Sequence, residues 1–246
     1  MTEPHWASQF YNGRTVVITG GTGGIGLELA MAFRDAGAIV HATGATDAEA
    51  RAAAGVQRAQ GIAFTTLDVR SDAAVAGYAS GFEAVTALVN CAGVNLRAAE
   101  YTPEGFATVL DINLAGSMRA ATAFRPKLGG GAILNIASMF AFFGAPHAPA
   151  YAASKGGVVQ LTKSLAIAYA AENIRVNALA PGWIETPMTA VPRANPARNA
   201  ELVGRTPLGR WGTPADLTGP ALFLCSPAAG FVTGTVLPVD GGFLIA

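Results

Sequence analysis

The feature that most constrains this chain is a glycine-rich turn between an expected strand and an expected helix. The segment TVVITGGTGGIGLELAMAF runs from β-branched residues through the turn into a stretch rich in alanine and leucine. Glycines let the backbone turn sharply and approach a pyrophosphate closely, and the N–H groups at a helix N-terminus attract its charge. The turn, with Gly20, Gly21, Gly23, Gly24 and Gly26, therefore predicts a nucleotide site. The spacing fits three glycine patterns, so it names no subfamily, and a turn that binds nothing is the alternative.

Short β-branched runs alternate with alanine-rich stretches along the whole chain. This alternation predicts βαβ units and a single doubly wound α/β domain of the Rossmann type over residues 1–246, with a parallel sheet of about seven strands. The expected strands are residues 14–19, 39–42, 62–67, 86–91, 132–137, 174–180 and 236–239. The expected helices are residues 24–36, 47–59, a short one from 71, 103–124, 150–171 and 214–224. Residues 183–213 are rich in proline and lack strand periodicity, which predicts a mobile substrate loop with short helices.

Composition and charge exclude several classes of partner. The formal net charge is +0 and the lysines and arginines are scattered singly, so we expect a small-molecule partner and neither nucleic acid nor membrane. The first residues lack a basic segment followed by an apolar one, which predicts a cytoplasmic protein. Cys91 and Cys225 are too few and too distant in the sequence for a zinc site or a disulfide framework, so we expect no metal.

A serine, a tyrosine and a lysine form a second candidate site. Ser138 ends an expected strand, and the spacing of Tyr151 and Lys155 puts both on one face of the next helix. Ligands of such folds bind at the carboxyl ends of the strands, so phenol and ammonium are expected in one cleft. The cation is expected to lower the pKa of Tyr151, which then exchanges a proton with a substrate oxygen that Ser138 also contacts. Asn113, in DINLAG, is either a polar link for proton relay or a helix residue with a local hydrogen bond.

With these residues in place, the chain resembles the short-chain dehydrogenase/reductase family over nearly its whole length. TGGTGGIG matches the cofactor turn of that family, the Asp68-Val69 pair its adenine-side dipeptide, and NCAG its N-N-A-G motif. Asn113, Ser138, Tyr151 and Lys155 match its catalytic tetrad. The resemblance implies a cofactor site formed by Gly20, Thr22, Gly24, Ile25, Gly26, Thr43, Asp68, Val69, Asn90, Ala92, Gly93, Tyr151, Lys155, Pro181, Gly182, Ile184 and Thr186.

The resemblance also implies an activity. The expected protein is an NAD(P)(H)-dependent oxidoreductase that interconverts a secondary alcohol and a ketone, with Tyr151 as general acid/base. By the same resemblance Lys155 also holds the nicotinamide ribose, and Asn113 supports a proton relay. The family implies a homotetramer built through long helices and the C-terminal strand. The helix at 150–171 is therefore expected to lie partly in an interface, to pack on the sheet, or to do both.

The choice between the two cofactors depends on the end of the second expected strand. Gly44 stands where an acidic residue would bind the ribose 2′-hydroxyl of NAD and repel a 2′-phosphate. Thr43 and Thr46 are neutral, no basic residue is adjacent, and Asp47 is expected to come close. This segment favours NADP(H) over NAD(H) by a small margin.

Four residues are candidates for binding the substrate: Phe140, His147, Trp183 and Met188. An aromatic wall suits an apolar or ring-bearing carbonyl, although such side chains also fill cores and interfaces. The runs IASMFAFFG and PAYAASKGG resemble family members that act on sugar acids and polyols. The substrate class therefore stays open.

Two rival functions share part of this pattern. A protein that binds a dinucleotide as a sensor or structural ligand would need the glycine turn, but the intact set of Ser138, Tyr151 and Lys155 argues against it. A sugar-nucleotide epimerase or dehydratase also carries Y-x-x-x-K, but normally has a larger C-terminal domain than the residues after 171 can form. An oxidoreductase is therefore the preferred prediction.

Overall fold

Seven parallel strands form the centre of the structure, a computed structural model that describes residues 6–246. They are β1 (Thr15–Thr19), β2 (Ile39–Gly44), β3 (Ala63–Thr66), β4 (Ala87–Asn90), β5 (Ala132–Ile136), β6 (Arg175–Pro181) and β7 (Val236–Val239). Their order across the sheet is β3-β2-β1-β4-β5-β6-β7, so the direction of winding changes between β1 and β4. Ligands of such sheets bind at that change, outside the carboxyl ends of the strands.

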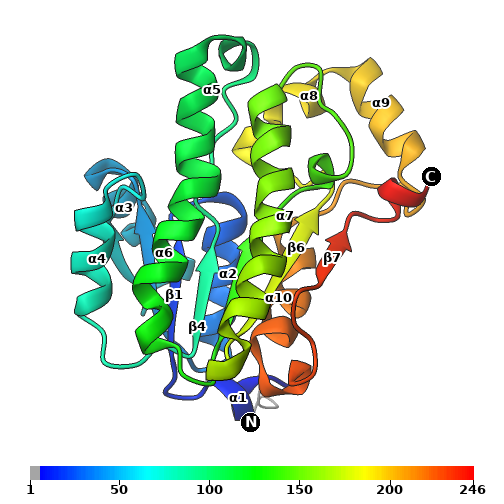
Figure 1. The fold of residues 1–246 in the computed structure, drawn as a ribbon. Coiled ribbons are helices and arrows are strands. Elements are labelled where there is room, and N and C mark those ends of the chain that lie inside the picture. The colour runs from blue at the N-terminus through cyan, green and yellow to red at the C-terminus, as the bar shows by residue number, and fades with distance from the viewer. Residues whose placement is uncertain (1–5) are drawn as a thin grey trace.

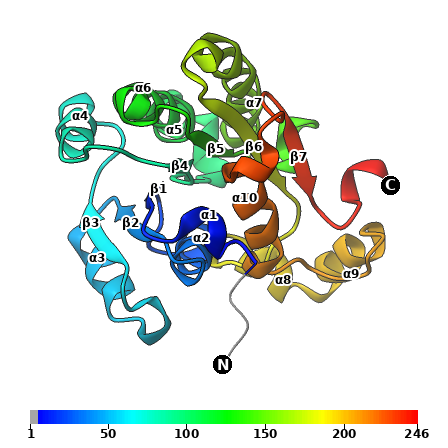
Figure 2. The same ribbon diagram turned by 90° about the horizontal axis from the view of Figure 1, so that it is seen from below.

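Helices cover both faces of the sheet. They are α1 (Ser8–Tyr11), α2 (Gly24–Asp35), α3 (Asp47–Ala54), α4 (Asp72–Ser80), α5 (Pro103–Leu110), α6 (Gly116–Phe124), α7 (Pro149–Tyr169), α8 (Ala190–Ala194), α9 (Pro196–Arg205) and α10 (Thr218–Cys225). Helices α4, α5, α6 and α7 lie on one face, and α1, α2, α3 and α10 on the other (Figure 2). Helices α8 and α9 lie together beyond the carboxyl ends of the strands, near the C-terminus (Figure 1).

The central strands are buried because their side chains meet a helical layer on each side. All five residues of β5, AILNI, are buried, as are all four of β4, ALVN. Such buried runs, apolar except for one asparagine in each strand, are typical of a parallel sheet covered on both faces. The prediction of a single doubly wound domain with about seven parallel strands is therefore confirmed.

Four details differ from the sequence-based expectations. The helix expected over residues 103–124 is divided by a π-helical turn, Asp111–Ala115, that separates α5 from α6. The helix expected over 47–59 ends at Ala54, and the final helix begins with a 3₁₀ turn at Pro214–Leu217. The short α1 was not expected at all; it is fixed by the buried Tyr11, whose hydroxyl donates to the carbonyl of Leu222 at 2.6 Å. No helix within residues 6–246 is long and apolar enough to span a membrane.

Candidate active site

A cleft of about 600 Å³ crosses the carboxyl ends of six strands. Its lining comes from the segments that follow β1 to β6, which the parallel sheet brings to one edge. Cavities of this size are typical of small-molecule and cofactor sites. The glycine turn after β1 and the segment after β4 form the wall at the point where the winding reverses.

The backbone of the glycine turn requires glycine at two positions. Gly20 has a φ of +66°, and a Cβ there would lie 2.6 Å from the Cα of Ala92. A Cβ at Gly26 would lie 2.1 Å from the carbonyl oxygen of Gly20. The turn is therefore held close to the next strand and to its own helix, and the N-terminus of α2 faces the cleft. This arrangement fits the pyrophosphate of a dinucleotide.

Most of the predicted cofactor residues line the cleft. Those that do so are Gly20, Thr22, Gly24, Ile25, Gly26, Asp68, Val69, Ala92, Gly93, Tyr151, Lys155, Pro181, Gly182, Ile184 and Thr186. Two others do not. The first is Thr43, whose side chain is fully buried; the next residue of the strand, Gly44, lines the cleft instead. Asn90 is also buried, and its amide donates to Asn135 Oδ1 at 2.9 Å, so its side chain ties β4 to β5, and its contact with a cofactor stays a prediction.

The part of the cleft that follows β3 contains an ion pair that was not expected from the sequence. Both oxygens of the Asp68 carboxylate accept hydrogen bonds from Arg70, and the closest contact, from Nη2, is 2.6 Å. Both residues line the cleft. The hydrogen bond from Arg70 lowers the pKa of Asp68, so the pair stays charged at neutral pH.

The structure brings Ser138, Tyr151 and Lys155 into the same cleft. Ser138 lies just beyond β5, and its hydroxyl accepts from the N–H of Phe140 at 3.2 Å. Tyr151 and Lys155 lie one turn apart on α7, with Nζ 5.6 Å from the centre of the tyrosine ring. Lys155 is buried and donates one hydrogen bond to the carbonyl of Ile136 at 2.6 Å. An ammonium group has three donors, so two remain for a ligand.

Burial dominates the ionisation of both groups. It raises the pKa of Tyr151 to about 12, while a hydrogen bond with Ser138 acts in the opposite direction. It also lowers the pKa of Lys155 to about 8. The direction for Tyr151 is opposite to the expected lowering of the tyrosine pKa, because desolvation of the phenolate outweighs the hydrogen bond with Ser138, and Cys91 and Glu100 also raise the pKa.

Asn113 lies in the π-helical turn between α5 and α6. Its amide donates to the carbonyl of Val94 and to Ser154 Oγ, both at 3.0 Å, and its oxygen accepts from the N–H of Val94 at 2.8 Å. A Cβ at Gly93 would lie 3.3 Å from Asn113 Oδ1 and 3.6 Å from Lys155 Nζ, so all three meet at one point. π-Helical turns often occur at functional sites. Here the turn fixes the segment after β4 against α7.

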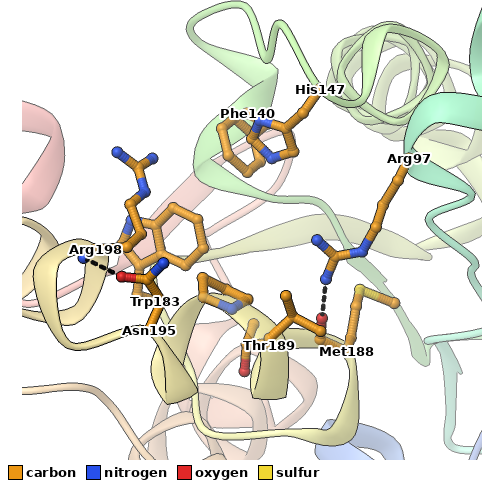
Figure 3. Close-up of a pocket in the computed structure, with 10 residues that line it drawn as sticks. Arg97, Phe140, His147, Trp183, Met188, Thr189, Asn195 and Arg198 are labelled. Atoms are coloured by element: carbon orange, nitrogen blue, oxygen red, sulfur yellow. Dashed lines mark hydrogen bonds between the residues drawn. The ribbon is translucent and has the colours of Figure 1, made fainter.

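A second cavity of about 300 Å³ adjoins the cleft (Figure 3). Met188 and Thr189 line both spaces, and the ring of Phe140 lies 6.3 Å from that of Tyr151, centre to centre. All four predicted substrate residues line this cavity; the other lining residues are Arg97, Thr189, Val191, Pro192, Asn195 and Arg198. A ligand here would therefore lie beside the tyrosine and beneath the loop that carries α8 and α9.

Two arginines line this second cavity, and one of them, Arg198, also pairs with Glu201 at 2.6 Å. Arg97 and Arg198 lie on opposite sides of it, and the Nη2 of Arg97 donates to the carbonyl of Met188 at 3.0 Å (Figure 3). Burial and both arginines lower the pKa of His147, so the imidazole is neutral at pH 7. The cavity therefore combines an aromatic wall with cationic donors suited to an anionic oxygen.

Glu100, a buried carboxylate between the cavity and α7, was not expected from the sequence. Its Oε1 accepts from the N–H of Leu96 and its Oε2 from the N–H of Tyr151, each at 2.9 Å. It therefore fixes the first turn of α7 and, with it, the position of the tyrosine. No local pattern signals Glu100 or the two arginines, because they depend on segments that are brought together only in the fold.

Comparison with known proteins decides the family. Residues 20–244 match the family model described as enoyl-(acyl carrier protein) reductase, within the short-chain dehydrogenases and reductases. The chain belongs to the short-chain dehydrogenase/reductase family. As a member of that family it is an oxidoreductase that acts on CH–OH groups with NAD(H) or NADP(H), so the predicted family, enzyme class and cofactor type are confirmed.

Three relatives of this short-chain dehydrogenase/reductase illustrate the match. The 2-dehydro-3-deoxy-D-gluconate 5-dehydrogenase of Bacillus subtilis is 40% identical over 242 residues, covering 94% of this chain and 95% of the relative. A galactitol 2-dehydrogenase of Cereibacter sphaeroides is 38% identical over 245 residues, covering 95% and 96%. A gluconate 5-dehydrogenase from Burkholderia cenocepacia, whose crystal structure contains NADP and tartrate, is 36% identical in sequence. Its structure superposes with a TM-score of 0.90 and the match covers 98% of this chain and 100% of that one.

Proposed function

We propose that this enzyme interconverts a secondary alcohol and a ketone within a sugar acid, with Tyr151 as the general acid/base. The oxidised nicotinamide supplies a hydride acceptor when it is bound. In the oxidative direction the phenolate of Tyr151 takes the hydroxyl proton while the carbinol hydrogen leaves as hydride. In the reductive direction the phenol returns that proton to the carbonyl oxygen.

The neighbouring residues support this assignment. Ser138, which forms a hydrogen bond with Tyr151, is placed to hold the same substrate oxygen. Lys155 keeps one donor on Ile136 and has two others for the nicotinamide ribose. Asn113 contributes by fixing the segment next to the lysine, and a proton relay through it stays a prediction.

The observation that carries the sugar-acid assignment is the pair of arginines that lines the second cavity. Arg97 and Arg198 flank a space next to Tyr151, and a substrate carboxylate between them would be paired with cations. The names of two of the relatives point the same way, since one acts on a sugar acid and another was crystallised with tartrate. A neutral polyol, the substrate of the galactitol relative, would offer Arg97 no anion, whereas Arg198 is already paired with Glu201 at 2.6 Å. The loop at 183–213 supplies Arg198 and is therefore proposed as the substrate loop.

A matched set of substrates tests this assignment. We would measure kcat/KM, by nicotinamide absorbance, for six-carbon sugar acids, for polyols of the same carbon number and for aryl ketones. The sugar acid that reacts fastest should exceed the corresponding polyol by at least about tenfold, the effect of one hydrogen bond to a charged group. A polyol or an aryl ketone that reacts as well as every acid tested would overturn the assignment.

We infer that the enzyme is a homotetramer of the cytoplasm. Large apolar side chains are exposed on elements through which the family assembles: Met118 on α6 is 43% exposed, Ile167 on α7 is 81%, and Ile245 after β7 is 92%. Exposed apolar groups on such elements favour association. Light scattering on the purified protein should give four times the chain mass, and a monomer mass at micromolar concentration would contradict the inference.

A further inference from the structure

In dinucleotide-binding folds the residue at the end of the second strand selects between NAD and NADP, and in this chain that residue is a glycine. β2 ends at Gly44, which lines the cleft but has no side chain to contact the adenosine ribose. A Cβ at Gly44 would lie 2.8 Å from Thr22 Oγ1 and 3.0 Å from Glu49 Oε2. The first atom of an acidic side chain at Gly44 would therefore clash with Thr22 and with the carboxylate of Glu49, which comes from α3.

The Glu49 carboxylate is fixed at this point by backbone donors. Its Oε2 accepts from the N–H of Ala45 at 2.7 Å and from the N–H of Thr46 at 3.3 Å. The second contact, with the return bond from the N–H of Glu49 to the hydroxyl of Thr46, forms a capping box at the start of α3. The shorter bond, to Ala45, lies outside that box and draws the carboxylate toward Gly44 and the cleft that both line.

A phosphate at this position would find few partners. The two N–H groups that follow Gly44 are already bonded to Glu49. The cations among the described residues lining the cleft are Arg70, paired with Asp68, and Lys155 beside the tyrosine. A dianionic 2′-phosphate would therefore meet a carboxylate and no unpaired cation, whereas a neutral hydroxyl could donate to that carboxylate.

We propose that Glu49 selects the cofactor: its carboxylate accepts a hydrogen bond from the 2′-hydroxyl of the adenosine ribose in NAD(H) and repels the 2′-phosphate of NADP(H). Asp47, which was expected from the sequence to approach this position, does not contact the cleft. Its Oδ1 accepts from the hydroxyl of Thr66 at 2.5 Å. NADP(H) binds the same cleft only after the hydrogen bond from the N–H of Ala45 to the carboxylate of Glu49 breaks.

This inference rests on the cofactor dependence of the family and not on the sugar-acid assignment, so binding without substrate tests it. Dissociation constants for NADH and NADPH would be measured by nicotinamide fluorescence for the unmodified protein, for Glu49→Gln and for Asp47→Asn. Glutamine also serves in a capping box, so Glu49→Gln removes the charge and keeps the start of the helix. Asp47→Asn is the matched control, because it removes a charge from the same helical turn outside the cleft.

The unmodified protein should bind NADH at least about tenfold more tightly than NADPH, and Glu49→Gln should reduce that ratio about tenfold, mainly by strengthening NADPH binding. Asp47→Asn should leave the ratio unchanged, and thermal unfolding should show all three proteins folded. Equal binding of the two cofactors by the unmodified protein would overturn the proposal. So would a ratio that Glu49→Gln leaves unchanged, or one that Asp47→Asn changes as much.

Discussion

Replacing Tyr151 by phenylalanine should lower turnover by a factor of about 10² to 10⁴, the range attributed to one positioned acid or base. The substitution removes the hydroxyl and keeps the ring, whose edge-to-face contact with Phe140 spans 6.3 Å between centres. The wall between the cleft and the second cavity should therefore stay intact. Fluorescence titration should show that the variant still binds NADH, while single-turnover assays show the loss of hydride transfer.

The pH dependence of the unmodified enzyme tests the same role. Because burial raises the pKa of Tyr151 to about 12, the phenol is protonated at neutral pH and is ready to act as the acid in reduction. Oxidation needs the phenolate, whose fraction grows as pH rises toward that pKa. The kcat/KM for alcohol oxidation should therefore rise with pH and that for ketone reduction should not. Substantial activity in the phenylalanine variant, or the same pH profile for both directions, would assign the proton transfer to another group.

The sheet could be predicted from the sequence because each strand is a short β-branched run bounded by a turn. β4 and β5 are continuous apolar segments and were found within one residue at each end. The π-helical turn could not be predicted, since DINLAG keeps a helical composition. What stabilises that turn is the contact of Asn113 with Val94 and Ser154, which come from other parts of the chain.

The same distinction separates the site residues that were found from those that were missed. The glycine turn and the Tyr151–Lys155 pair are local patterns, with their geometry set by one turn or one helix. The side chain of Thr43 is buried and the cleft is lined by Gly44 instead, a difference of one strand residue that the sequence pattern does not resolve. The T-x-x-E spacing of Thr46 and Glu49 marks a capping box but not its place in the cleft, and no local pattern marks the place of Arg198 in the second cavity.

Replacing Arg97 or Arg198 by methionine should lower kcat/KM for the preferred sugar acid by about 10- to 100-fold, the effect of losing a hydrogen bond from a cation to a carboxylate. The backbone supports a functional role for Arg97, which has a φ of +52°, a conformation uncommon outside glycine and often kept at binding sites. Its N–H is held in that turn by Asn95 Oδ1 at 3.0 Å. The prediction is checked by measuring kcat/KM for the sugar acid and for the corresponding polyol with each variant.

A loss of loop packing must be separated from a loss of charge recognition, because Arg97 also donates to the carbonyl of Met188. Loosening the loop would lower kcat/KM for the acid and the polyol alike, whereas loss of the cation would affect the acid alone. Arg193→Met is the matched control, since Arg193 lies on α8 and pairs with Glu185 at 2.9 Å without lining the cavity. Arg97→Lys keeps the charge but not the planar fork, and should recover only part of the activity toward the acid. Equal losses for acid and polyol in both arginine variants would make the two side chains supports of the loop, and the carboxylate would then have to bind elsewhere in the cleft.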